Sequence, residues 1–202
     1  MGSRSTSRTF PGFDRIFLLG EPGNSRAFRV DLGVDTREDA FGLTRAEVRP
    51  SHPLSAEWAM GQAKPLEVIR TTFAAPIIIA DAVVQLLRTE GFTGWSLYDV
   101  AVRGKQGQPI PGYHGFSVTG RCGNIDWAQG VEVLRIYPAR VSPVWKGLFF
   151  DPESWDGSDV FMPAERVGYV FVVEEVKKAF EQAKIRNVDF TPLDQFERSW
   201  PL

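Results

Sequence analysis

An acidic and aromatic stretch at residues 149–161 holds the densest set of side chains that could do chemistry. It reads Phe-Phe-Asp-Pro-Glu-Ser-Trp-Asp-Gly-Ser-Asp-Val-Phe, with four carboxylates, one indole and no basic residue. Asp151-Pro152 and Asp156-Gly157 are turn signals, because proline fixes φ near about −65° and glycine accepts positive φ. We therefore expect a rigid acidic loop between two strands.

This acidic loop has two interpretations. In the functional one it recognises another protein: the carboxylates of Asp156 and Asp159, with Ser158 between them, attract a basic partner, and Trp155 supplies anchoring area. In the structural one the Asp and Ser side chains cap their own backbone and Trp155 packs against the core. The loop oxygens lack the regular ligand spacing of an EF-hand, so we expect no metal site.

Tyr113-His114 is the second candidate, because a hydroxyl and an imidazole could serve acid-base chemistry or a binding surface. The chain has two histidines, and His52 precedes a proline in what reads as a solvated loop. A hydrolase or nucleic-acid-modifying enzyme would need His114 within hydrogen-bond reach of Asp156 or Asp159. The simpler interpretation of Tyr113-His114 is the start of a strand beside a turn.

No recognisable catalytic or cofactor motif accompanies these residues. The sequence has no GxSxG, GxGxxG, HExxH or phosphate-binding Gly-Lys-Ser/Thr loop. Cys122 follows Arg121, which could lower the thiol pKa, but free cysteine is among the most buried residue types. We expect no catalytic residue, no cofactor and no metal.

Composition restricts the class of protein. The 202 residues carry 23 basic and 25 acidic side chains, and a net charge of −2 gives no global attraction for nucleic acid or anionic membrane. One cysteine excludes an intrachain disulfide. Residues 1–8 lack the apolar core of a secretory signal, and the apolar run at 74–80 is too short to span a bilayer. We expect a cytoplasmic protein that does not bind membranes.

The elements that must position these residues begin after a disordered tail at residues 1–9. Short strands are predicted at 13–19 and 28–32, forming a hairpin or the first strands of a sheet. Charged residues and prolines at 33–64 predict a loop with short strand pieces. Further strands are predicted at 131–137 and at 144–150, which leads into the acidic loop.

Two segments have the same strand-helix-strand pattern. The first has a strand at 76–79, a helix from Ala82 to about Glu90 with Asp81 as its N-cap, and a strand at 95–100. The second has a strand at 169–173, a helix beginning at Glu174 and a strand at 185–190. Shifted by 93 positions, Val83 matches Val176 and Leu87 matches Phe180, as in two copies of one element.

These elements predict an α+β protein: a mainly antiparallel sheet with about two helices packed on it, including the two strand-helix-strand units. We expect a single domain at residues 10–202, which could be divided into lobes at 10–72 and 73–202. An uncovered sheet edge could also support a homodimer.

Three segments carry a family resemblance. They are Trp-Asp-Gly-Ser-Asp-Val-Phe at 155–161, Tyr-Val-Phe-Val-Val-Glu-Glu-Val at 169–176 and Ile-Arg-Asn-Val-Asp-Phe-Thr-Pro-Leu at 185–193. Together they resemble the C-terminal half of the bacterial family called immunity protein eleven, over roughly residues 95–193. Some similar myxobacterial proteins carry paired CxxC motifs, from which this chain departs because it has Cys122 alone.

The resemblance implies a non-enzymatic protein that binds and neutralises a cognate polymorphic toxin. The residues we expect at the partner surface are Trp155, Asp156, Ser158, Asp159, Tyr113 and His114. Because a motif shared across such a family also serves the fold, partner choice could instead lie in residues 33–64.

Overall fold

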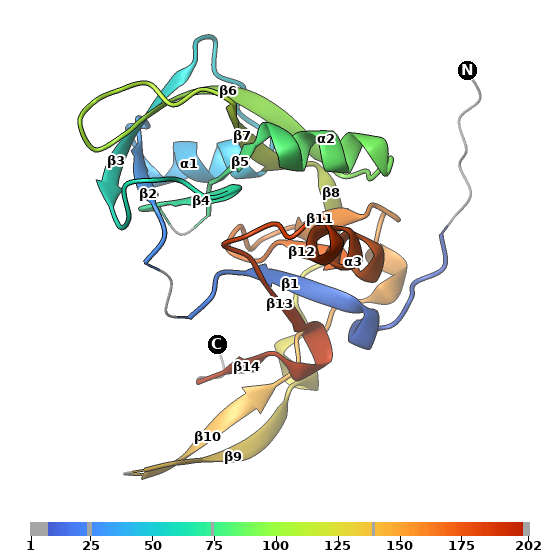
Figure 1. The fold of residues 1–202 in the computed structure, drawn as a ribbon. Coiled ribbons are helices and arrows are strands. Elements are labelled where there is room, and N and C mark those ends of the chain that lie inside the picture. Colours follow the sequence, from blue (N-terminus) through green and yellow to red (C-terminus); the bar gives the residue numbers. More distant parts are fainter. Residues whose placement is uncertain (1–7, 24–25, 74, 139, 200–202) are drawn as a thin grey trace.

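The chain forms an α+β fold in which a closed six-stranded barrel lies against a five-stranded sheet (Figure 1). The computed structural model describes residues 8–23, 26–73, 75–138 and 140–199. The barrel has the strand order β2-β3-β6-β7-β5-β4. Its strands are β2 (Arg29–Leu32), β3 (Leu54–Met60), β4 (Val68–Thr71), β5 (Ile77–Ala80), β6 (Trp95–Arg103) and β7 (Tyr113–Val118).

The two other sheets are built mainly from the C-terminal half of the chain. The five-stranded sheet has the order β13-β1-β12-β11-β8, and a three-stranded sheet has the order β14-β10-β9. The strands are β1 (Ile16–Gly20), β8 (Gly120–Cys122), β9 (Val131–Tyr137), β10 (Arg140–Lys146), β11 (Val160–Pro163), β12 (Phe171–Val173), β13 (Asp189–Pro192) and β14 (Glu197–Arg198). Most strand pairs are antiparallel, which confirms the predicted fold class.

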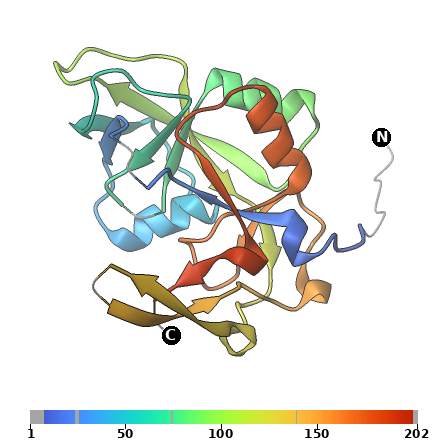
Figure 2. The same cartoon turned by 60° about the horizontal axis from the view of Figure 1, so that its bottom comes forward.

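Three α-helices and four short 3-10 helices complete the described part of the chain (Figure 2). The α-helices are α1 (Arg37–Thr44), α2 (Asp81–Thr89) and α3 (Glu174–Gln182). The 3-10 helices are η1 (Phe13–Arg15), η2 (Trp127–Gln129), η3 (Pro152–Ser154) and η4 (Leu193–Gln195). Helix α2 begins one residue earlier than predicted, with Ala80 as its N-cap.

Two apolar cores hold the fold together. The smaller fills the barrel interior with side chains such as Phe28, Ile69 and Ile78. The larger lies between the outer surface of the barrel and the five-stranded sheet, and includes Ile77 and Phe171. Successive side chains of β5 point into different cores: Ile77 lies in the larger core and Ile78 in the smaller one. This strand is therefore apolar on both faces and connects the two cores.

The two predicted strand-helix-strand units share one geometry. In each unit the two strands are parallel and lie on either side of a third strand that is antiparallel to both: β7 separates β5 from β6, and β1 separates β12 from β13. The helices end alike, since Phe92 N–H donates to Leu87 O and Ile185 N–H to Phe180 O, both at 3.0 Å. The shift of 93 positions therefore describes a real structural repeat.

The N-terminal third differs from the sequence prediction. The stretch 33–64 is not loop with short strand pieces, because it contains α1 and the seven-residue strand β3. Helix α1 begins at a cap that the mixed charge pattern concealed: Thr36 Oγ1 accepts from Asp39 N–H at 3.1 Å. Thr44 at the end of this helix is buried against the barrel.

Strands β1 and β2 do not form a hairpin or share a sheet. Both edges of β1 pair with C-terminal strands, and β2 pairs instead with β3 and β4. A division at residues 72–73 would cut the barrel between β4 and β5. Of the predicted tail, residues 1–7 lie outside the described part, whereas Arg8 contacts the acidic loop.

Candidate functional site

Asp156 pins the acidic loop to the neighbouring strand β8. Its Oδ2 accepts from Arg121 N–H at 2.7 Å, and its Oδ1 accepts from Ser158 N–H at 2.9 Å. The backbone N–H of Asp156 in turn donates to Arg121 O at 3.1 Å. Both carboxylate oxygens therefore satisfy backbone donors, as in an Asx turn, although the residue remains exposed.

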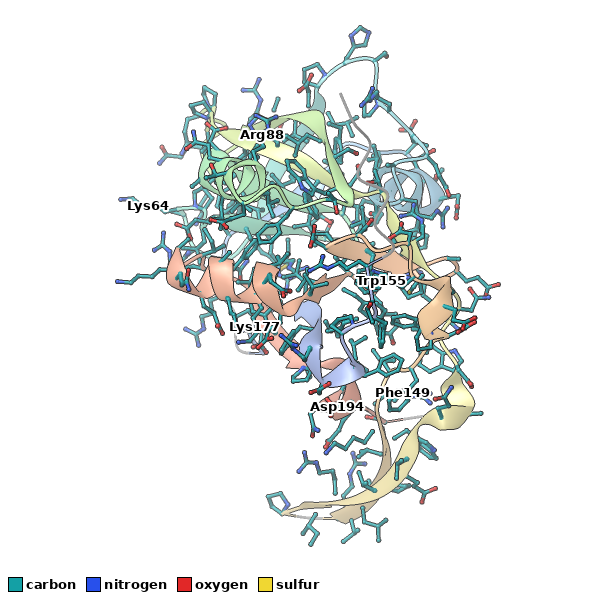
Figure 3. All side chains as sticks on the ribbon, turned by 90° about the vertical axis from the view of Figure 1, so that its right-hand side faces the viewer. Lys64, Arg88, Phe149, Trp155, Lys177 and Asp194 are labelled. Atoms are coloured by element: carbon teal, nitrogen blue, oxygen red, sulfur yellow. The ribbon has the colours of Figure 1, made fainter. Side chains whose placement is uncertain are left out.

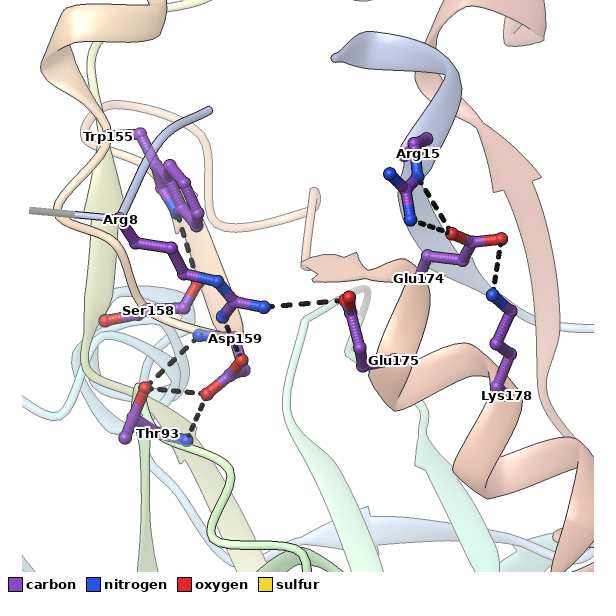
Figure 4. Close-up of polar contacts among 9 residues, drawn as sticks. All are labelled: Arg8, Arg15, Thr93, Trp155, Ser158, Asp159, Glu174, Glu175 and Lys178. Atoms are coloured by element: carbon purple, nitrogen blue, oxygen red, sulfur yellow. Dashed lines mark hydrogen bonds and ion pairs between the residues drawn. The ribbon is translucent and has the colours of Figure 1, made fainter. Parts of the chain in front are cut away.

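Asp159 ties the same loop to the barrel. Its Oδ2 accepts from the N–H and the Oγ1 of Thr93, at 2.8 and 2.9 Å, and Thr93 lies just before β6 (Figure 4). Oδ1 accepts from Arg8, which also reaches Glu175 at 3.5 Å. Asp159 is 8% exposed, so this buried carboxylate is neutralised by an N-terminal residue that the local sequence did not reveal.

Trp155 belongs to the larger core. Figure 3 shows Trp155 among the side chains beside the acidic loop. Its side chain is 8% exposed and packs against Phe10 and Phe161, with ring centroids 5.9 and 5.7 Å away. The indole N–H donates to Ser158 O at 3.1 Å, which closes the turn from inside. The aromatic surface of Trp155 is therefore buried by contacts within the fold.

A glycine permits the close approach between this loop and the barrel. Gly94 has φ +88°, and a Cβ there would lie 1.9 Å from Val160 O. Around it, Val160 N–H donates to Thr93 O at 3.0 Å. The acidic loop is therefore a clamp between the barrel and the five-stranded sheet, and the structural interpretation accounts for each contact described above. A role in partner binding stays a prediction for Asp156 and Ser158, which keep exposed surface.

His114 and Tyr113 lie on β7, away from the acidic loop. His114 faces Asp99 and Val118 faces Trp95 across the β6–β7 pair, so His114 is about 13 Å along the strand from the end nearest Thr93. Its Nε2 lies 2.6 Å from Oδ1 of Asp81. The hydroxyl of Tyr113 donates to a backbone carbonyl, Leu66 O, at 3.2 Å.

The His114–Asp81 contact has a counterpart in the second repeat. Asp81 is the first residue of α2, and Glu174, 93 positions later, is the first residue of α3. Glu174 is held by Arg15, at 2.7 Å, from just before the intervening strand β1 (Figure 4). Each unit therefore joins a carboxylate at its helix start to a basic side chain near the start of its middle strand, which favours a structural role for His114.

Cys122 is not in a reactive environment. The side chain is buried, and burial raises the pKa of the thiol to about 12, so the thiol is protonated near neutral pH. Arg121 does lower the thiol pKa as the sequence suggested, but this contribution is smaller than that of burial. Within the described ranges, no three His, Cys, Asp or Glu residues come together as a metal site.

The most accessible apolar surface lies on the arm, defined as strands β9 and β10. Figure 1 shows the arm extending away from the barrel and the five-stranded sheet. Leu134 and Ile136 are 68% and 84% exposed, and Val141 is 57% exposed. Across the strand pair Leu134 faces Pro143 and Ile136 faces Val141, so these four side chains share one face. We call it the arm face.

The arm also presents a free strand edge. In the order β14-β10-β9, strand β9 is the outer member, and no other described strand pairs with it. Exposed edges with apolar side chains are sites where proteins associate. The alternation in Val-Glu-Val-Leu-Arg-Ile predicted a strand here, but both of its faces are partly apolar, so periodicity could not show which one is uncovered.

Comparison with protein-family models and with curated proteins found no match. In the parts of the chain that the structure describes, no helix has the length and apolar character required to cross a membrane.

Proposed function

We propose that this protein acts by binding another protein, without catalysis, and that the arm face is its docking surface. The observation that carries the proposal is the concentration of exposed aliphatic side chains on a projecting two-stranded arm. Such a ribbon gains little stability from burial of its own, because its face has no covering layer. A partner that covers the face supplies the missing burial.

The size of the arm face favours a different protein over a second copy. Full burial of an aliphatic side chain corresponds to about 60–120 Å², so the four side chains offer on the order of 300 Å². Two arm faces packed together would bury roughly 600 Å² in total, well below the ~1,200 Å² of a standard stable interface. A partner with a groove can instead cover the arm face together with the free edge of β9, and can add contacts beyond these four side chains.

The charged side chains of the arm lie mainly on its other face. The two strands contain three basic residues, Arg135, Arg140 and Lys146, and one acidic residue, Glu132. By register the basic residues lie on the face opposite the arm face. Because Arg135 on that face is already paired with both carboxylate oxygens of Glu197, the partner groove we propose is defined by the apolar arm face. The resemblance to the immunity protein eleven family supports a cognate toxin as this partner.

The test compares two arm variants of tagged protein. The double variant Leu134→Ser, Ile136→Ser removes two side chains from the arm face, and Val131→Ser is the matched control because Val131 is 62% exposed on the opposite face. Proteins captured from source lysate are identified by mass spectrometry, and the purified partner is titrated. Each removed side chain should cost about 1.5–3 kcal/mol of binding free energy, because its burial against the partner is lost. The double variant should therefore bind at least ~100-fold more weakly.

The outcomes separate the possible occupants. A toxin that binds wild type and Val131→Ser equally, but not the double variant, supports the proposal. Unchanged affinity of the double variant would place binding elsewhere, with the exposed Asp156 as the next position to substitute. If light scattering instead shows a homodimer that the double variant dissociates, a second copy occupies the arm and the toxin proposal fails.

A further inference from the structure

A second feature, far from the arm in the fold, is a cavity between the end of β1 and the barrel strands β2 and β4. Its volume is about 300 Å³. Leu18 and Phe73 contribute apolar walls, while Glu21, Arg29 and Arg70 bring the charged groups. The volume is at the lower end of the ~300–1,000 Å³ range of ligand pockets, which suits a small ligand.

Two arginines side by side give this cavity its chemistry. Arg29 and Arg70 are register partners on neighbouring parallel strands, so their side chains leave the barrel on the same side. Arg29 donates to Glu21, and one terminal nitrogen of Arg70 donates to Gly20 O. The Nε of Arg70 is buried and has no hydrogen-bond partner among the described residues. A buried donor in this state is energetically costly.

Only one of the two oxygens of the Glu21 carboxylate accepts a hydrogen bond from a described residue. Its Oε2 accepts from Arg29, whereas Oε1 is buried without a partner in the described part of the chain. Two guanidinium groups against one carboxylate leave the cavity with an excess positive charge. Burial lowers the pKa of Arg70 to about 10, and Glu21 partly opposes that effect, so Arg70 remains charged at neutral pH.

We propose that this cavity binds a small oxyanion that carries its own O–H group, the chemistry shared by inorganic phosphate and a 2-hydroxycarboxylate. The anionic oxygens accept from Nε of Arg70, and the O–H donates to Oε1 of Glu21. One ligand thus satisfies both buried groups and balances the excess charge. An anion without an O–H would place its oxygens against the Glu21 carboxylate, where two acceptors repel.

Isothermal titration calorimetry on the full chain at pH 7 and constant ionic strength tests this proposal with four probes. Phosphate and lactate carry the required O–H, whereas sulfate and acetate are matched anions without one. We expect phosphate or lactate to bind at least about tenfold more tightly than sulfate and acetate. Only the probes with an O–H can donate the buried, charge-assisted hydrogen bond to Glu21. Whichever of the two binds identifies the ligand source.

Variants locate the binding. Arg70→Met is expected to weaken the bound probe by about tenfold or more, and Glu21→Gln to remove the preference for it over sulfate. Arg26→Met is the control, because Arg26 lies in the same connection but does not line this cavity. If Arg70→Met does not fold, the anion comparison on wild type and Glu21→Gln decides. Equal binding of all four probes, or no saturation by roughly 10 mM, would overturn the proposal.

Discussion

Replacing Asp159 by alanine tests whether the acidic loop is a clamp. The change removes two hydrogen bonds from Thr93 to a carboxylate that is 8% exposed, along with the contact to Arg8. Hydrogen bonds to a charged group contribute about 1.5–3 kcal/mol each, and water can replace part of the loss at this partly buried site. We therefore expect Asp159→Ala to lower the free energy of unfolding by about 3 kcal/mol.

The measurement is urea unfolding followed by tryptophan fluorescence, with thermal unfolding as a second probe. A loss of about 3 kcal/mol corresponds to a fall in Tm of roughly 6–12 °C for a chain of this size. Asp159→Asn, which keeps one acceptor, should lie between alanine and wild type. Glu153→Ala removes an exposed carboxylate from the same loop and should change stability by less than about 0.5 kcal/mol. A similarly small effect of Asp159→Ala would refute the clamp.

Three further predictions follow from single positions. Tyr98→Phe should raise stability by about 1 kcal/mol in urea unfolding, because the buried Tyr98 hydroxyl has no partner among the described residues. Lys184 corresponds to Gly91 in the other repeat, and both have positive φ, at +54° and +70°, a conformation that glycine adopts most easily. Calorimetry should therefore show that Lys184→Gly stabilises the protein by up to about 1 kcal/mol, whereas Gly91→Ala destabilises it. The hydrogen bond from Arg186 lowers the pKa of Glu67. This bridge should therefore stabilise the protein fully above about pH 4.3 and lose its effect as the pH falls through the lowered pKa, so urea unfolding of Glu67→Gln and wild type should converge in acid.

The sequence predicted those elements whose order is local. Helices α2 and α3 were found because Val83, Leu87, Val176 and Phe180 fall on one buried face of each helix. The barrel was not predicted. It closes through the parallel pairs of β2 with β4 and of β3 with β6, and no local sequence pattern shows which strands pair. Helix α1 is short and only weakly amphipathic, so its Thr36 cap was the one signal available.

The acidic loop shows that a functional site, like the barrel, depends on contacts that the local sequence does not reveal. The turns at Asp151 and Asp156 were predicted from neighbouring residues, and both carboxylates do accept from nearby backbone N–H groups. The partners that decide the role of Asp159, namely Thr93 and Arg8, are 66 and 151 positions away. Local composition identified an unusual loop, but long-range pairing determined what its carboxylates do.

The central place of β1 also sets the order in which the protein can assemble on the ribosome. The barrel uses one continuous segment, from β2 to β7, and can close while the rest of the chain is still being made. Strand β1 emerges earlier, yet both of its neighbours, β12 and β13, lie about 150 or more positions further along the chain. At about 5–20 residues per second, β1 waits on the order of 10 s with two open edges. The nascent protein therefore passes through a stage with a finished barrel and an exposed apolar strand, which a chaperone would recognise.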